Sequence, residues 1–223
     1  MTNVPKQRMN MTTRAAQKQR TREAIIAAAL RKLNEDKGLS SLSLREVAKE
    51  AGIAPTSFYR HFKNLDALGL ELIETATQKL HALLKTAKQS HQKTDDITQS
   101  LVGYCLDHFK ENGDLFRVLA REAVGSSAEL RQAIKKELAL INKELAHLIE
   151  LESRLKHRNI TDASMVAEAI STIIFYIGVS TIDLPYAMRK DAEQRLIHHI
   201  KAIYNGAEVM ANRLHLERQM MLS

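Results

Sequence analysis

The amino-acid sequence predicts an all-α protein of about nine helices. Only three prolines and eight glycines interrupt its 223 residues. Ala, Leu, Ile, Glu, Lys and Arg are abundant, and these residues form helices readily. No segment alternates apolar and polar residues as a half-buried strand would. A chain of this length can bury one large core, or a small domain joined to a larger one.

The first three helices follow from apolar spacing and from the residues between them. From about Gln17, apolar residues recur every three or four positions, and Gly38 is a stop signal. Ser43 and Glu46 form the S-x-x-E capping box that begins a second helix. Gly52 ends that helix, where positive φ is expected, and Pro55 suits the first turn of a third. The apolar face of the first helix consists of Ile25, Ile26, Ala29, Leu30 and Leu33.

Longer helices fill the rest of the chain. A fourth helix is expected to begin at Asn64 or Asp66 and to run to about Ser90. The apolar spacing then predicts helices over about 95–111, 114–123, 127–157, 162–183 and 188–218.

Positive charge is concentrated at the N-terminal end. Residues 1–63 contain 13 Lys and Arg against 5 Asp and Glu, a net charge of +8, whereas 64–223 contain 20 against 21, a net charge of −1. A cationic module on a near-neutral body favours a polyanionic partner. An uneven but merely soluble surface is the alternative.

The second and third helices predict a helix-turn-helix. Val47, Ile53 and Phe58 can close a small core across a turn of about four residues. The outer face of the third helix then carries hydroxyl, phenol, guanidinium and imidazole groups, which bind phosphates and base edges. Such a helix presents its N-terminal end to the major groove of double-stranded DNA. The predicted DNA-contacting residues are Arg20, Thr21, Ser43, Arg45, Ala54, Pro55, Thr56, Ser57, Tyr59, Arg60, His61 and Lys63.

Several of these assignments have structural alternatives. Arg60 is expected to read guanine, or else to grip the backbone. His61 is expected at a phosphate, or else buried between helices. Arg14, Lys18, Arg20 and Arg22 should approach phosphates or the minor groove, although each could equally be a solvated charge. Ser43 and the second helix's N-terminal amides should hold a phosphate, or simply cap the helix.

Residues 18–72 resemble the N-terminal domain of TetR-type transcriptional repressors. The resemblance lies in KQRTREAIIAAAL, in LSLREVAKEAGIAPTSFYRHF and in the following DALGL. Two positions depart from the usual pattern. Ala54 stands where many relatives have a capping serine, and Leu65 where many have a lysine. Ala54 cannot supply a capping oxygen, whereas Lys63 could substitute for the missing cation.

Within that family the chain resembles the proteobacterial repressors of unsaturated fatty-acid biosynthesis, including at LFRVLAREAVGSS (115–127). That resemblance implies a repressor that binds a palindromic operator and responds to a long-chain acyl thioester, on coenzyme A or acyl carrier protein. Two alternatives remain. One is a repressor of an efflux or other operon that responds to a drug-like hydrophobic ligand. The other is a lipid-binding protein with a non-functional DNA head.

These assignments give three regions: a disordered basic arm (1–15), a helix-turn-helix domain (16–65), and a helical effector-binding and dimerisation domain (66–223). Helix 162–183 is apolar almost all round, as expected if its own chain buries one side and a partner buries another. Pairing it with 188–218 could build a homodimer interface. By family resemblance the effector pocket lies between the middle helices, where ordinary core packing is the alternative. Its candidate residues are Tyr104, Phe109, Phe116, Leu119 and Phe175.

Other classes of function find little support in the sequence. The single cysteine, Cys105, excludes an internal disulfide, suits a reducing cytoplasm and is expected to be buried. The N-terminus lacks the apolar run of a signal peptide. The longest charge-free apolar stretch, 169–182, is shorter than the roughly 20 residues of a membrane span. No metal-ligand cluster, nucleophile elbow or phosphate loop is present, so we expect no enzyme activity, no metal and no cofactor.

Overall fold

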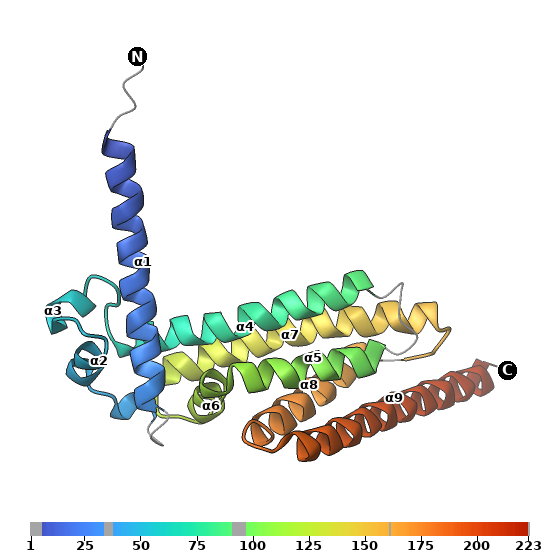
Figure 1. The fold of residues 1–223 in the computed structure, drawn as a ribbon. Helices are drawn as coiled ribbons and strands as arrows, with labels where there is room; N and C mark the ends of the chain where they lie inside the picture. The colour runs from blue at the N-terminus through green and yellow to red at the C-terminus, as the bar shows by residue number, and fades with distance from the viewer. Residues whose placement is uncertain (1–5, 34–37, 91–96, 161, 223) are drawn as a thin grey trace. The chain divides into compact units, whose positions relative to one another are not determined.

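The structure is a computed structural model that describes residues 6–33, 38–90, 97–160 and 162–222. Its regular elements there are all helical (Figure 1). The all-α prediction is therefore confirmed. The elements are α1 (Lys6–Leu33), the 3-10 helix η1 (Leu39–Ser41), α2 (Leu44–Glu50), α3 (Pro55–Phe58), α4 (Leu65–Ser90), α5 (Ile97–Glu111), α6 (Gly113–Glu122), α7 (Ala128–Leu155), α8 (Ala163–Ser180) and α9 (Tyr186–Leu222).

The predicted and observed helix boundaries agree within a few residues, with one large exception. Helix α1 already begins at Lys6, so residues 6–15 are helical where the sequence predicts a disordered arm. Residues 1–5 of that arm lie outside the described residues. At the other end, α9 continues to Leu222, beyond the predicted end near 218.

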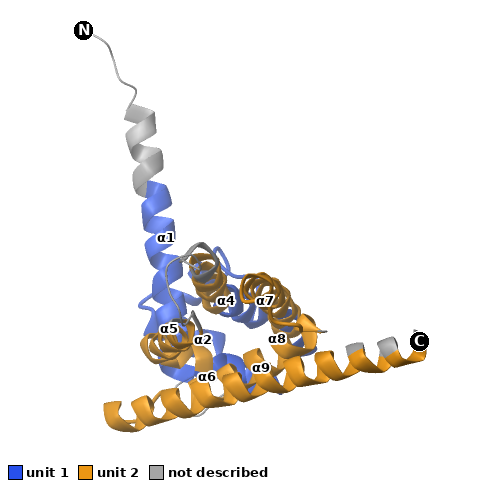
Figure 2. Ribbon diagram, turned by 90° about the vertical axis from the view of Figure 1, so that its right-hand side faces the viewer, with its two compact units in different colours: residues 1–74, 117–133 blue, residues 75–116, 134–223 orange. Residues whose placement is uncertain are grey.

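The chain forms two compact units (Figure 2). Unit 1 combines Met1–Glu74 with Arg117–Ala133, and unit 2 combines Thr75–Phe116 with Ile134–Ser223. The sequence predicts a single boundary near residue 65, whereas the units divide inside α4, α6 and α7. Each of these three helices therefore contributes to both units.

The core of unit 1 joins helices that are distant in the sequence. Helix α1 contacts α2, and α2 contacts α3. The fully buried side chains include Phe58 from α3 and Leu130 from the start of α7. Burying such side chains is the main favourable term for folding, roughly 25 cal/mol per Å² of apolar surface. Further core residues of this unit are Ile25, Ala29, Leu33, Val47, Ala48, Leu68 and Leu72.

In unit 2, α5, α8 and α9 contact one another. Phe109 on α5 lies directly against Gly178 on α8. A Cβ added at Gly178 would be 2.7 Å from the Phe109 ring. A glycine is therefore required for this helix contact. Cys105 is buried as predicted, and burial raises the pKa of its thiol to about 12, so it is an unreactive core residue.

Helix α8 has one buried face and one exposed face. Val166, Ala167, Ile170 and Ile174 are buried by the chain itself, as predicted for one side of this helix. The opposite face leaves 49% of Met165 and 72% of Tyr176 exposed. By length and composition Ala163–Ser180 could also cross a membrane, with 33% of it buried, but core helices of soluble proteins meet the same criteria.

His81 on α4 bridges two carboxylates of α7 within unit 2. Its Nδ1 lies 3.0 Å from Glu144 Oε1, and its Nε2 lies 3.4 Å from Glu137 Oε2. Burial alone would lower the pKa of His81, but the two carboxylates outweigh burial and raise it. Protonation therefore strengthens the attachment of α4 to α7.

Two glycines with open space around them should respond oppositely to alanine. Gly52 has φ of +69°, whereas Gly206 lies inside α9, and an added Cβ meets nothing within 4 Å at either position. Gly52→Ala should lower the free energy of unfolding by about 1–2 kcal/mol, the cost of left-handed backbone for an L-residue. Gly206→Ala should raise it by about 0.5–1 kcal/mol. Urea unfolding measures both free energies. Equal effects of the two substitutions would contradict the assignment of left-handed backbone to Gly52 and helical backbone to Gly206.

The His81 bridge predicts a pH-dependent stability. Because its folded-state pKa is raised above the unfolded value of about 6.5, the contribution is fully present below that pH. It is lost as pH rises through the folded-state pKa. His81→Gln should therefore destabilise the protein more at about pH 6 than at about pH 8. At each pH, the difference in free energy of unfolding between variant and wild type removes the contribution of the other histidines. A difference that does not change with pH would exclude the bridge.

Candidate nucleic-acid interface

The turn between α2 and α3 is a Schellman motif at the end of α2. The Ile53 N–H donates to the Ala48 carbonyl at 3.0 Å, and the Gly52 N–H donates to the Lys49 carbonyl at 3.1 Å. Gly52 has φ of +69°, as the sequence predicts. This motif satisfies carbonyls at the end of α2 and reverses the chain direction within four residues. The turn thereby sets how α3 crosses α2.

The two helix starts are built differently. At α2, the Ser43 N–H donates to Glu46 Oε2 at 3.4 Å, which confirms this half of the predicted capping box. At α3, Ala54 is the N-cap residue and offers no side-chain hydrogen bond, while Pro55 occupies the first turn. The N-terminal amides of α3 therefore lack a protein side-chain cap in this turn.

Helix α3 and the turn that follows it have an aromatic inner side and a polar outer side. Phe58 is fully buried, and its ring centroid lies 5.7 Å from that of Phe62. Tyr59 meets Phe58 edge-on, with 61% of its surface exposed. Half-buried Ile53 completes this inner side less fully than predicted. The phenyl rings thus fix α3 against the core of unit 1 and leave its polar groups accessible.

The structure brings most of the predicted DNA-contacting residues together on the α2–α3 segment. Among these, Ser43, Ser57 and His61 are half-buried. From α1, Arg20 is exposed, while Thr21 is half-buried and its hydroxyl donates to the Gln17 carbonyl at 3.0 Å. The exposed members of the α2–α3 segment are Arg45, Ala54, Pro55, Thr56, Tyr59, Arg60 and Lys63.

His61 is held in place by its surroundings. Its carbonyl accepts a hydrogen bond from Arg22, and its Nδ1 is buried without a hydrogen-bond partner. Burial lowers the pKa of His61, and the nearby charges of Lys18, Arg22 and Arg60 lower it further. The imidazole of the DNA-free protein is therefore neutral at neutral pH.

Arg22 joins three elements of unit 1. From α1, its Nε and Nη2 donate to the two carboxylate oxygens of Glu71 on α4, at 3.1 and 2.6 Å. Its Nη1 donates to the His61 carbonyl at 3.0 Å, and its guanidinium lies 4.4 Å from the centre of the Phe62 ring. Only arginine makes this forked contact with a carboxylate. Arg22, predicted as a candidate DNA contact, therefore has a structural role.

The end of α6 contacts the last residue of α1 and the first residue of η1. Arg121 Nη1 donates to the Leu33 carbonyl at 3.0 Å, and Glu122 Oε1 accepts from the Leu39 N–H at 2.7 Å. Glu122 is only 4% exposed, so this backbone contact compensates for part of its desolvation. Arg121 thus binds the backbone of unit 1.

The partners in these structural roles cannot be identified from a single sequence. Arg22 and Glu71 are 49 positions apart, and Leu39 and Glu122 are 83 apart. No local spacing rule links residues so distant. Helix periodicity places Arg22 on the same side of α1 as Ile25 and Ala29, which indicates an inward-facing side chain but does not identify its partner.

The predicted effector-pocket residues lie in different environments. In unit 2, Phe109 stacks on Phe116 with centroids 4.2 Å apart and meets Phe175 edge-on at 5.9 Å. Tyr104 is 64% exposed, whereas Leu119 is buried and belongs to unit 1. Three of the five residues therefore form one aromatic cluster. A cavity lined by this cluster stays a prediction.

An exposed polar α3 that follows a Schellman turn, in a basic N-terminal segment, is typical of a DNA-binding helix-turn-helix protein. Residues 25–72 match the family model described as bacterial regulatory proteins, tetR family. Residues 93–203 match the model described as tetracyclin repressor-like, C-terminal domain. The chain therefore belongs to the TetR family and is a transcriptional regulator of that family.

Solved structures share this fold. A putative TetR-family regulator from Syntrophomonas wolfei superimposes with a TM-score of 0.68 at 17% identity, covering 82% of this chain and 94% of its own. A TerR/AcrR-family regulator from Aquifex aeolicus gives 0.65 at 20% identity, covering 82% and 99%. The fatty acid degradation regulator FadR from Bacillus halodurans gives 0.61 at 20% identity, covering 83% and 93%. At these identities the likeness establishes the fold alone.

Two arginines one helical half-turn apart in α1 should separate stability from DNA binding. Arg22→Gln removes the forked contact with Glu71 and should lower the free energy of unfolding by about 1–2 kcal/mol. Arg20→Gln should leave stability unchanged, weaken DNA binding uniformly across sequences and reduce its salt slope by about 1. Urea unfolding and salt-dependent DNA titration measure these effects. Equal stability loss in both variants would contradict the assignment.

Proposed function

We propose that this protein is a cytoplasmic repressor that binds a palindromic operator as a homodimer and controls genes of unsaturated fatty-acid biosynthesis. Its operator affinity responds to a long-chain acyl thioester. The observation that carries the DNA-binding part is the exposed polar surface of α3 and of the turn that follows it, with Thr56 and Arg60 accessible beside the buried Phe58.

The chemistry of that face suits the major groove. Pro55 and Thr56 lie at the N-terminal end of α3, which is the end that reaches base edges in helix-turn-helix proteins. Arg60 is exposed and can present two donors to guanine O6 and N7. Lys63 and Arg20, both exposed, are suited to phosphates.

Homodimerisation is supported by the exposed face of α8 in unit 2. Six residues at helical spacing line a groove of about 480 Å³ there, including the apolar Met165, Ile173 and Tyr176. Helix α9 also exposes Val209, Met210 and other large apolar side chains. A second copy of the chain would bury these faces in a symmetric four-helix contact. Such a dimer presents two α3 helices to the two halves of a palindrome.

The fatty-acyl effector rests on the sequence resemblance and on the apolar interior of unit 2. The ring cluster of Phe109, Phe116 and Phe175 offers an apolar environment of the kind an acyl chain prefers. The similar fold of the Bacillus halodurans FadR is compatible with this assignment. Because α4, α6 and α7 each run through both units, a ligand that prefers one state of unit 2 would shift the population of states of unit 1.

The operator is expected to bind the chain in a gel-shift titration with a palindromic duplex, and oleoyl-coenzyme A should change that affinity by at least about fivefold. An increase and a decrease both support the proposal, because the sign reports which state the ligand prefers. Free coenzyme A is the matched control. Unchanged affinity with oleoyl-coenzyme A would leave a repressor with another hydrophobic effector and exclude the fatty-acid role.

Substitutions of two cations near α3 should affect DNA-sequence selectivity differently. Arg60→Ala should weaken operator binding by about 1–3 kcal/mol and relax selectivity at one base pair. Lys63→Ala should weaken operator and non-operator duplexes alike. Competition gel shifts with single-base operator variants measure both. Retained selectivity in a folded Arg60→Ala protein would exclude its base-reading role.

A further inference from the structure

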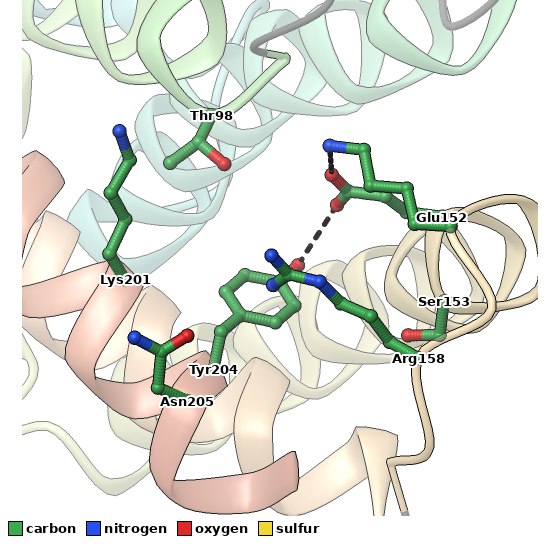
Figure 3. Close-up of a pocket in the computed structure, with 8 residues that line it drawn as sticks. Thr98, Glu152, Ser153, Arg158, Lys201, Tyr204 and Asn205 are labelled. Atoms are coloured by element: carbon green, nitrogen blue, oxygen red, sulfur yellow. Dashed lines mark hydrogen bonds and ion pairs between the residues drawn. The ribbon is translucent and has the colours of Figure 1, made fainter.

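Unit 2 contains a polar cavity that the proposed function does not use (Figure 3). Its volume is about 370 Å³, and its walls come from α5, the end of α7, the segment after α7, and α9. Thr98 of α5 faces Lys201 and Tyr204 of α9 across the opening (Figure 3). This volume lies within the usual range for small-molecule sites, about 300–1,000 Å³.

The wall of the cavity is positively charged. Lys156, Arg158 and Lys201 contribute three cations, and Glu152 contributes one carboxylate. Glu208, outside the wall, lies 4.0 Å from Arg158 Nε and offsets part of this charge. With three cations and one carboxylate, the wall lacks the several carboxylate or imidazole ligands that a metal site requires. The charge therefore favours an anion.

The single carboxylate is already engaged. Glu152 is buried, its Oε1 accepts from Lys156 Nζ at 2.7 Å, and its Oε2 accepts from the Tyr204 hydroxyl at 3.4 Å. Burial and the Glu152 carboxylate raise the pKa of Tyr204, so the phenol keeps its proton at neutral pH. These contacts hold Glu152 at one edge of the cavity (Figure 3).

One buried hydroxyl of the wall has no partner. Ser153 is 7% exposed, and its Oγ makes no hydrogen bond among the described residues. Buried polar groups in folded proteins are nearly always hydrogen-bonded, by protein or by a bound molecule. A rotation of the Ser153 side chain toward the opening would let an anion in the cavity supply the missing acceptor.

We propose that this cavity binds a small molecule bearing a phosphate group, with Arg158 and Lys201 at the phosphate and Ser153 donating to one of its oxygens. Guanidinium and ammonium groups recognise phosphate through charge-assisted hydrogen bonds. Asn205 and Thr98 supply both donors and acceptors for the polar remainder of such a ligand. The site is thus a second ligand site, distinct from the aromatic cluster.

The phosphate could belong to a free metabolite or to coenzyme A, and calorimetric titration of the full chain separates these sources. Inorganic phosphate and glycerol 3-phosphate should bind at millimolar or lower concentration, whereas glycerol should not. Tighter binding of coenzyme A than of glycerol 3-phosphate would assign the site to an acyl carrier, and the reverse order to a free metabolite. Either order supports a phosphate site.

Matched variants locate the binding. Arg158→Gln and Lys201→Gln should each weaken glycerol 3-phosphate binding by roughly tenfold, the effect of losing one charged hydrogen bond. Arg213→Gln is the control, because Arg213 lies on α9 in an ion pair with Glu217 and outside the cavity wall. Ser153→Ala should weaken binding without lowering thermal stability, since it removes an unpaired hydroxyl.

Two results would overturn this inference. One is the absence of binding by all three phosphate compounds in the wild-type protein. The other is phosphate binding that Arg158→Gln and Lys201→Gln leave unchanged while both variants remain folded by thermal unfolding. Operator binding plays no part in these measurements, so the proposed repressor function can fail or hold independently.

Discussion

The contact between Arg22 and Glu71 fixes the backbone that follows α3 within unit 1. It joins α1 to α4, and the same guanidinium holds the His61 carbonyl and covers the Phe62 ring. The backbone that leaves α3 is therefore attached to both long helices of the unit. A forked arginine contact fixes direction as well as distance. It gives the short α3, four residues long, an orientation that its own hydrogen bonds could not maintain.

A second set of contacts attaches a later part of the chain to the same unit. Glu122 accepts from the Leu39 N–H, Arg121 donates to the Leu33 carbonyl, and the Ser127 hydroxyl donates to Asp66. The compact unit that contains the helix-turn-helix therefore also includes 117–133. Any change in the course of α6 or α7 alters backbone partners of the helix-turn-helix unit directly.

Local chemistry explains which features the sequence could predict. The positive φ of Gly52, the Ser43–Glu46 cap, the missing cap at Ala54 and the two faces of α8 each follow from neighbouring residues. The unit boundary within α4 and the role of Arg22 could not be predicted from neighbouring residues. Both depend on contacts between residues dozens of positions apart, which helix periodicity cannot pair. The polar cavity was missed for the same reason, since its wall comes from three separate segments, at 98, 152–158 and 201–205.

We propose that two copies of this chain present two α3 helices to DNA. Selection of bound duplexes from a random pool by the full-length protein examines this arrangement without knowledge of the operator. We expect enrichment of an inverted repeat whose half-site centres lie about one helical turn, roughly 34–36 Å, apart. Enrichment of no motif, or of a single asymmetric half-site, would contradict it.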